Sequence, residues 1–526
     1  MNIKLLGSVV VIFFMTTCNG DNISTEKQDQ KGDLLEVTVN LEESYQVIRG
    51  FGASDAWSIQ FVGKNWSLEK RERIADLLFS TDVDDVGNPV GIGLSIWRFN
   101  IGAGSARQGE ESGINDPWRR AESFLTADST YDWNRQQGQQ WFVRAAAERG
   151  VDTFIGFVNS PPVLLTKTGK AYGDGGERAN IAPHHYDDFA DYLARIGTYF
   201  ESQGTPFSYL SPVNEPQWDW SQDNGQEGSP YQNVEIDGVV QALNQKLQEY
   251  NLDTKIEIPE TAQIDFLYAG NLPGRSRQIE HFFGPESDVR ELPAVAQKMA
   301  GHSYFTTWPI SDMIEKRRRV RQHIEQAAAP IEYWMSEYCI LANNEEIRGG
   351  SRDFGINPAL YVARVLHYDM TVAHASSWQW WLAVSPYDFK DGLVYIDQDI
   401  QNGRVYESKL LWGLGNYSRF IRPGSVRVGI SRSDRATPEE ASRGIMASAY
   451  KHSESGNITV VLINYSREQH SLSLTFQGGE SAEIGDVTPF VTSASQNLEQ
   501  QPVISVDEPL FLPARSVTTL QAVTPN

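Results

Sequence analysis

Short apolar runs alternate with longer amphipathic segments between residues 49 and 384. Segment 186–200 is typical of the amphipathic kind, because its large apolar side chains recur at helical spacing on one face. The apolar runs have the length and composition of buried strands. Eight strands are predicted, at Arg49–Ser54, Gly93–Ile101, Thr153–Ser160, Phe207–Asn214, Lys255–Glu260, Lys298–Phe305, Glu332–Glu337 and Ser376–Leu382. Eight strands alternating with helices predict an α/β fold, a (β/α)8 TIM barrel, over residues 49–412.

The pattern changes after about residue 415, where short strands follow one another with turn residues between them. The predicted strands are Val426–Ile430, Ile445–Lys451, Ile458–Asn464, Ser471–Phe476 and Ser516–Val523. They predict a C-terminal all-β sandwich domain over residues 413–526. Residues 35–48 begin with the same alternation, so we expect this segment to be an N-terminal strand of the sandwich.

The strongest chemical signal is Asn214-Glu215-Pro216, which ends the fourth predicted strand. Pro216 cannot donate to a central ladder, so the strand stops at the acid. A carboxyl group fixed there, beside an amide that can bond a sugar hydroxyl, suits a glycosidase general acid. A retaining glycosidase needs a second carboxylate roughly 5–5.5 Å away. Glu337 ends the seventh predicted strand and is the best candidate.

Other polar and aromatic residues gather at the same carboxyl ends of the predicted strands, where barrel enzymes carry their active sites. Several have a structural reading of equal weight: Asp55 suits a turn cap, Arg98 a structural ion pair, and Tyr304 either a partner of Glu337 or a plain rim residue. The candidate substrate-binding residues are Asp55, Trp57, Arg98, Asn159, Asn214, Trp218, Tyr304, Trp380 and Trp381. Together they predict a carbohydrate site.

Composition narrows the class of ligand. Aromatic residues make up 11% of the chain, with 14 Trp, which supplies sugar-stacking platforms as well as core. The net charge of −23 argues against nucleic acid and anionic membrane surfaces as partners. A retaining mechanism needs neither metal nor cofactor, so we expect none. His184-His185 beside Asp187 and Asp188 could form a metal site, but a solvated helix start explains this segment better. We also expect a monomer.

The N-terminus resembles a bacterial lipoprotein signal. A short positive region precedes an apolar run at Leu5–Met15 that is too short to span a bilayer. Small residues then lead to Cys18, which we expect to be the lipidated first residue after removal of residues 1–17. Residues 18–34 are expected to be a flexible tether. These features predict a bacterial cell-envelope lipoprotein, attached to a membrane only through Cys18, with ordinary signal cleavage and secretion as the alternative.

A family resemblance rests on these motifs. Gly50-Phe-Gly-Ala-Ser-Asp55, Asn214-Glu215-Pro216, Ser336-Glu337-Tyr338 and the junction segment 413–423 resemble glycoside hydrolase family 30, over about residues 35–525. The resemblance implies a retaining hydrolase with Glu215 as acid/base and Glu337 as nucleophile.

The branch that is most similar is the endo-β-1,6-galactanases, which implies cleavage of β-1,6-linked galactan, the side chains of arabinogalactan. β-1,6-Glucanases, xylanases and glucosylceramidase-like enzymes share the frame and stay open as alternatives. So do a transglycosylase using the same residues and, in another class, a non-catalytic glycan-binding lipoprotein.

Overall fold

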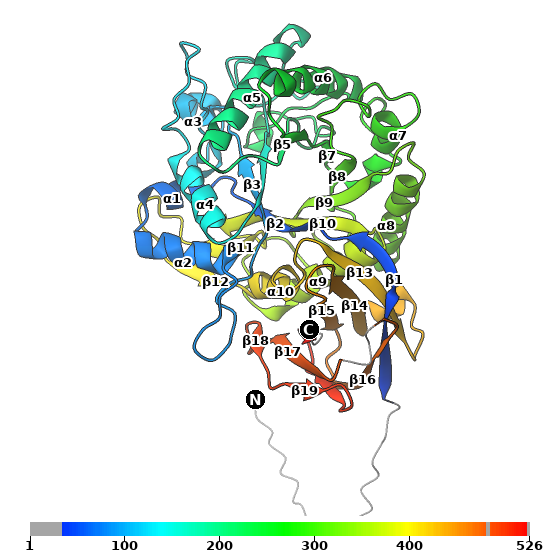
Figure 1. Ribbon diagram of the computed structural model, residues 1–526. Coiled ribbons are helices and arrows are strands. Elements are labelled where there is room, and N and C mark those ends of the chain that lie inside the picture. The colour runs from blue at the N-terminus through cyan, green and yellow to red at the C-terminus, as the bar shows by residue number, and fades with distance from the viewer. Residues whose placement is uncertain (1–33, 480–483, 523–526) are drawn as a thin grey trace, which may run out of the picture. The chain divides into compact units, whose positions relative to one another are not determined.

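The computed structural model describes residues 34–479 and 484–522. The predictions for residues 1–17, Cys18 and most of the tether therefore lie outside the described residues. Two sheets organise the described part, one mostly parallel and one mostly antiparallel (Figure 1). No helix in this part of the chain is long and apolar enough to cross a bilayer.

The parallel sheet closes on itself as a barrel. Its strands are β2 (Gly50–Ser54), β3 (Ile96–Asn100), β4 (Thr153–Phe157), β5 (Tyr209–Ser211), β6 (Lys255–Ile256), β7 (Pro259–Thr261), β8 (Lys298–His302), β9 (Glu332–Tyr338) and β10 (Ala375–Ser385). Neighbours pair in chain order, and β10 pairs with β2. β6 and β7 are two pieces of the fifth strand, because β6 pairs with β5 and β7 with β8. A hairpin of β11 (Gly392–Ile396) and β12 (Val405–Glu407), which the pattern did not predict, extends β10.

The helices lie outside the barrel strands (Figure 1). They are α1 (Ile59–Asn65), α2 (Leu68–Phe79), α4 (Gln137–Glu148), α5 (Tyr186–Ser202), α6 (Asn233–Glu249), α7 (Gln278–Phe283), α8 (Ile310–Glu325), α9 (Ile356–Thr371) and α10 (Lys409–Ser418). α5 forms where the periodic segment 186–200 predicts a helix. Its large apolar face is buried, as amphipathic spacing requires.

The second sheet contains the N-terminal strand β1 together with the strands of the C-terminal part of the chain. β1 (Leu35–Val47) pairs antiparallel with β13 (Ser425–Arg432) and parallel with β16 (His470–Gln477). The other strands are β14 (Ile445–His452), β15 (Ile458–Asn464), β17 (Asp486–Thr492), β18 (Glu499–Gln500), β19 (Ile504–Ser505), β20 (Leu510–Leu512) and β21 (Ser516–Ala522). The predicted fold class is confirmed. The predicted boundary at residue 413 falls inside α10, whose Asn416 bonds Thr519 while Ser418 bonds the carbonyl of Ile92.

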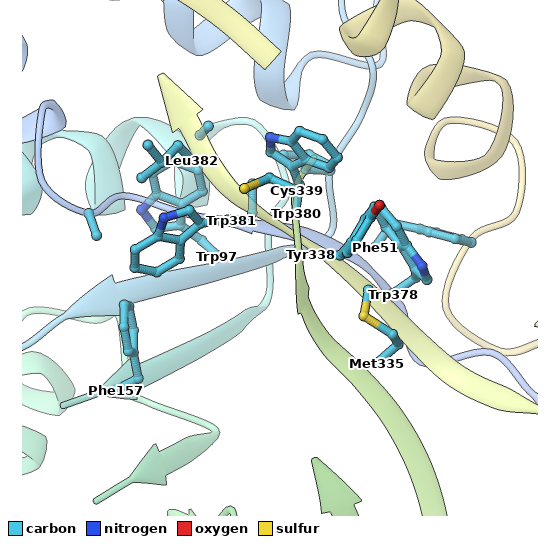
Figure 2. Close-up of a cluster of buried hydrophobic side chains, with 14 of the residues drawn as sticks. Phe51, Trp97, Phe157, Met335, Tyr338, Cys339, Trp378, Trp380, Trp381 and Leu382 are labelled. Atoms are coloured by element: carbon cyan, nitrogen blue, oxygen red, sulfur yellow. The ribbon is translucent and has the colours of Figure 1, made fainter. Parts of the chain in front are cut away.

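Tryptophan fills much of the barrel core. Trp97, Trp378 and Trp380 are fully buried, and the last two stack with ring centroids 6.2 Å apart (Figure 2). Many of the 14 Trp therefore supply core volume, and fewer are left as sugar platforms.

Candidate active site

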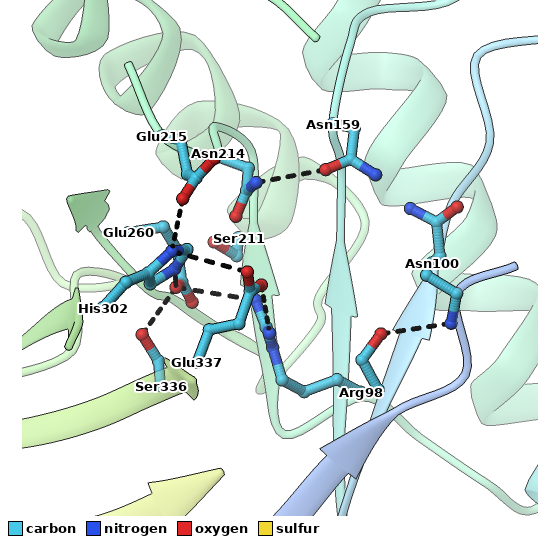
Figure 3. Close-up of polar contacts among 12 residues, drawn as sticks. Arg98, Asn100, Asn159, Ser211, Asn214, Glu215, Glu260, His302, Ser336 and Glu337 are labelled. Carbon is cyan, nitrogen blue, oxygen red and sulfur yellow. Dashed lines mark hydrogen bonds and ion pairs between the residues drawn. The ribbon is translucent and has the colours of Figure 1, made fainter. Parts of the chain in front are cut away.

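Glu215 and Glu337 converge at the carboxyl ends of their strands. Glu215 follows β5, and Glu337 is the penultimate residue of β9 (Figure 3). One carboxylate oxygen of each lies within 4.8 Å of the other, although 122 residues separate them in the chain (337 − 215). Retaining glycosidases hold the two carboxyl groups about 5–5.5 Å apart, and inverting ones about 6.5–9.5 Å. The spacing is that of a retaining pair.

Two donors fix the carboxylate of Glu337. Arg98 on β3 donates from Nη1 to Oε2 at 2.9 Å, and the Tyr304 hydroxyl donates to Oε1 at 3.0 Å. Arg98 is fully buried, and its guanidinium lies 4.3 Å from the ring centre of Phe157. A buried guanidinium and a hydroxyl together hold the carboxylate in one orientation. A carboxylate oriented in this way suits the role of a nucleophile.

His302, at the end of β8, lies between three carboxylates. Its Nδ1 is 3.1 Å from Oε1 of Glu215 and 3.6 Å from Oε1 of Glu337, and its Nε2 is 2.7 Å from Oε2 of Glu260. Burial lowers the pKa of His302, but the charge of Glu337 and the bonds to Glu215 and Glu260 outweigh burial and raise it to about 10. His302 is therefore an imidazolium at neutral pH.

Glu260 on β7 anchors the other side of this histidine. It is fully buried, accepts a bond from the Ser336 hydroxyl at 2.6 Å and lies 3.5 Å from Nη2 of Arg98. Burial alone would raise the pKa of Glu260. The Arg98 charge and the bond from His302 reverse that effect and lower it well below its usual range.

Glu215 lies beside the His302 imidazolium and two other acidic groups. Burial raises the pKa of Glu215, the bond from His302 opposes the rise, and the charges of Glu337 and Glu260 add to it. A carboxyl group with a raised pKa beside an ionised partner is the arrangement of an acid and a nucleophile.

The backbone of Glu215 is itself strained and held in place. Its φ is +46°, in the left-handed region that non-glycine residues rarely adopt. Its amide donates to the carbonyl of Glu260 at 2.8 Å, and its carbonyl accepts from Trp218 N at 3.2 Å and Trp220 Nε1 at 3.1 Å. Such conformations cost about 1–3 kcal/mol and persist where the surroundings over-determine them, often at active sites.

These groups open into a cavity of about 340 Å³, the active-site pocket. Predicted residues that line it are Asn214, Glu215, Trp218, Tyr304, Glu337 and Trp381; the others are Trp220, Asn224, Gln226, Phe305 and Leu341. Asn159 does not line the cavity, but its Oδ1 accepts a hydrogen bond from Nδ2 of Asn214, which does, at 3.1 Å. Aromatic faces and bonded polar groups in one concavity suit a sugar ring. A similar cavity beside residues 103–127 contains neither catalytic candidate.

Five predicted binding residues lie outside this lining: Arg98 and Asn159, described above, and Asp55, Trp57 and Trp380. Asp55 is fully buried and accepts bonds from the backbone of Asn100 at 2.8 Å and from Gln139 at 3.0 Å, so it connects β3 and α4 and does not cap its own turn. Burial raises its pKa to about 7. Trp380 is fully buried and donates to the carbonyl of Asp391. Trp57 is 5% exposed and packs edge-on against Trp381. These residues support the wall of the pocket.

Sequence reasoning missed Glu260 and His302 as site residues. Both end strands, the fifth and the sixth, so the rule that singled out Glu215 and Glu337 applies equally to them. Trp220 and Phe305 were also missed. They follow the strand ends within loops, where no periodic pattern gives a side chain its direction.

Glu215, His302 and Glu337 also have the spacing of a metal-binding group, with one ligand atom of each within 4.8 Å of the others. A histidine must be neutral and offer a lone pair to bind a metal. Both ring nitrogens of His302 already face carboxylates, and its pKa is raised. The three residues therefore fit a proton-bearing cluster better than a metal site.

Comparison with known proteins gives the class. The model of O-glycosyl hydrolase family 30 matches residues 34–395, and the chain belongs to this family. It is an O-glycosyl hydrolase. A conserved exported protein from Bacteroides fragilis is similar at 34% identity over 92% of this chain and 100% of that one, with a TM-score of 0.87.

Two characterised relatives are more distant. The glucuronoxylanase XynC of Bacillus subtilis (strain 168) is 22% identical over 92% of this chain and 91% of its own length. An exo-β-1,6-galactobiohydrolase of Bifidobacterium longum subsp. longum is 26% identical over 30% of this chain and 11% of that protein. The names of these two proteins give different sugars, so similarity to them leaves the sugar that this chain cleaves open.

Proposed function

We propose that this chain is a retaining endo-β-1,6-galactanase that acts on galactan side chains of arabinogalactan. The observation that carries the retaining mechanism is the pair Glu215 and Glu337, with carboxylate oxygens within 4.8 Å at the floor of an aromatic pocket.

In the first step, the carboxylate of Glu337 attacks the anomeric carbon of the bound sugar, and Glu215 protonates the departing glycosidic oxygen. The result is a glycosyl-enzyme ester on Glu337. In the second step, Glu215 takes a proton from water as the water displaces Glu337, so the anomeric configuration is retained. Asn214, held by Asn159, bonds the 2-hydroxyl. The ester removes the charge of Glu337, which lets Glu215 ionise for its role as base.

The choice of β-1,6-galactan rests on motif resemblance and on the partial similarity to a galactobiohydrolase. β-1,6-Glucanase, xylanase and glucosylceramidase-like activities are the alternatives on the same frame. Product profiles from β-1,6-galactan, β-1,6-glucan and xylan separate them. Release of short galactooligosaccharides from galactan alone supports the proposal, and preferred cleavage of either other polymer overturns the substrate.

The mechanism is tested with Glu337→Ala. We expect loss of turnover by roughly 10⁴-fold or more, as for removal of other catalytic nucleophiles. Azide should restore part of the activity and give an α-glycosyl azide. Full activity of Glu337→Ala, or an inverted first product by NMR, contradicts the proposal. Glu332→Gln, on the same strand but away from the pocket, is the matched control.

We also propose that the protein is a monomeric envelope lipoprotein anchored at Cys18. Metabolic labelling with a palmitate analogue should label the wild type and not Cys18→Ala, which should leave the membrane fraction. Equal labelling and fractionation of both proteins contradicts the anchor.

A further inference from the structure

A second cavity, of about 450 Å³, opens between three loops at the carboxyl end of the barrel; we name it the rim pocket. Its polar lining comes from the loop after β3, the loop after β5 and the loop after β10. The side chains that matter below are Asn115, Asp116, Arg119, Gln222, Asp223 and Tyr387.

One short segment separates the rim pocket from the active-site pocket. Gln222, Asp223 and Gly225 line the rim pocket, whereas Asn224 and Gln226 line the active-site pocket. Residues 222–224 form a single 3₁₀ turn, in which successive side chains point in different directions. The two cavities therefore lie on either side of segment 222–226.

On the β10 side, a series of contacts between aromatic rings and one guanidinium runs from the active-site pocket to the rim pocket. Trp381, which lines the active-site pocket, packs edge-on against Trp57 with ring centroids 5.4 Å apart. The Arg119 guanidinium lies 5.7 Å from the Trp57 ring and 5.1 Å from the Tyr387 ring. Cation–π contacts of this kind fix a guanidinium in place. Arg119 in the rim pocket is thus linked to Trp381 in the wall of the active-site pocket through a single ring, that of Trp57.

The polar groups of the rim pocket are only partly used by the protein. The Asp223 side chain forms no ion pair or hydrogen bond within residues 34–479 and 484–522. Asp116 caps the turn at Trp118 with one oxygen, and the side chains of Asp116 and Arg119 both interact with the Tyr387 hydroxyl. One cation and two carboxylates give the pocket a net negative charge, which disfavours an acidic ligand. Fixed donors and acceptors beside an aromatic ring suit a neutral, hydroxyl-rich one.

We propose that the rim pocket is a second sugar subsite, which binds a neutral sugar unit of the same polysaccharide chain whose reacting unit occupies the active-site pocket. This inference rests on the proposed function as a glycan hydrolase and specifies how that site selects long chains. Binding energy from a distant unit raises kcat/KM without touching the reacting bond.

The test compares a substrate ladder from two to six units of the backbone that the wild-type enzyme hydrolyses best. Asp223→Ala removes an exposed carboxylate that forms no ion pair or hydrogen bond within the described residues, so the fold should survive. We expect kcat/KM on the six-unit substrate to fall by about 5-fold or more, mainly through KM, and to fall far less on the two-unit substrate. Arg119→Gln should give a larger fall in the ratio of kcat/KM on the six-unit substrate to kcat/KM on the two-unit substrate, because the guanidinium offers several donors and is held in place by two rings.

Asp253→Ala is the matched control, since Asp253 is also exposed and precedes β6 at the opposite end of the barrel. Asp253→Ala should leave the ratio of kcat/KM on the six-unit substrate to kcat/KM on the two-unit substrate at the wild-type value. Equal losses on short and long substrates in both rim variants, or no loss in either, overturn the subsite. Failure of the proposed galactanase function shows instead in the wild type, as a preference for another backbone, and leaves the ladder ratio intact.

Discussion

Two buried acid–base pairs lie on the same strands of the barrel and differ in how they carry their charge. Lys298 and His302 are four residues apart on β8, so both side chains lie on the same face of the strand. Lys298 forms an ion pair with Glu257, and His302 bonds Glu260. All four residues are almost fully buried. The first pair lies below the candidate active site, and the second belongs to it.

Burial dominates the first pair. It lowers the pKa of Lys298 to about 8 and raises that of Glu257 to about 7, although the two partners attract each other. The ammonium group lies among the rings of Trp334 and Tyr209. In the second pair, Arg98 and Glu337 add one charge of each sign, and the pKa of His302 rises to about 10. A buried group therefore stays charged when several oppositely charged partners surround it, whereas a single partner does not fully offset the effect of burial on its pKa.

The largest expected effect comes from Lys298→Met, which leaves Glu257 buried alone. Breaking a buried pair on one side costs about 3–5 kcal/mol. The pKa of Glu257 then rises further, so the folded state holds a proton that the unfolded state releases above about pH 4.5. Stability must therefore fall as pH rises. Urea unfolding should show a greater loss at pH 8 than at pH 5. Lys64→Met, at an exposed position on α1, should lose little at either pH. An equal loss at both pH values contradicts the charge argument.

The next effect, on activity, is that of Glu260→Gln. Removing this negative charge lowers the pKa of both proton carriers, His302 and Glu215, because the charge of Glu260 raises both. The alkaline limb of kcat/KM should therefore move to lower pH, by about one unit. His302 should titrate earlier by NMR.

Glu332→Gln, the same exchange at the opposite end of β9, is the control and should leave the profile unchanged. If the alkaline limb of kcat/KM stays at the same pH in Glu260→Gln and activity falls equally at every pH, Glu260 acts through packing and not through its charge.

Much of this arrangement could be predicted from the sequence. The alternation of apolar runs predicts all eight barrel strands, and strand-end position predicts Glu215 and Glu337, because parallel strands bring their carboxyl ends to one rim. The same rule also reaches Glu260 and His302, but a lone acid or histidine at a strand end carries no signal of its partners.

The rest could not be predicted, for physical reasons. Asp55, Trp57 and Trp380 have the residue types of a sugar site, yet the turn after β2 and the packing of β10 direct them into the core. Direction depends on local backbone geometry, which residue type does not encode. The pairing of Lys298 with Glu257 depends on register between strands, which only the folded barrel sets.

The smallest expected effect comes from replacing both members of the first pair, in the double variant Glu257→Met, Lys298→Met. Methionine matches the volume of both side chains, and replacing a buried ion pair by apolar residues is often neutral or stabilising. Stability should return to within about 2 kcal/mol of the wild type. In the wild type, the raised pKa of Glu257 makes stability fall between about pH 4.5 and pH 7, since the unfolded state releases its proton first. The double variant should lose this slope in urea unfolding. A double variant as unstable as Lys298→Met would mean that the shape of this layer matters more than its charge, and the contrast between the two pairs would then lose its electrostatic basis.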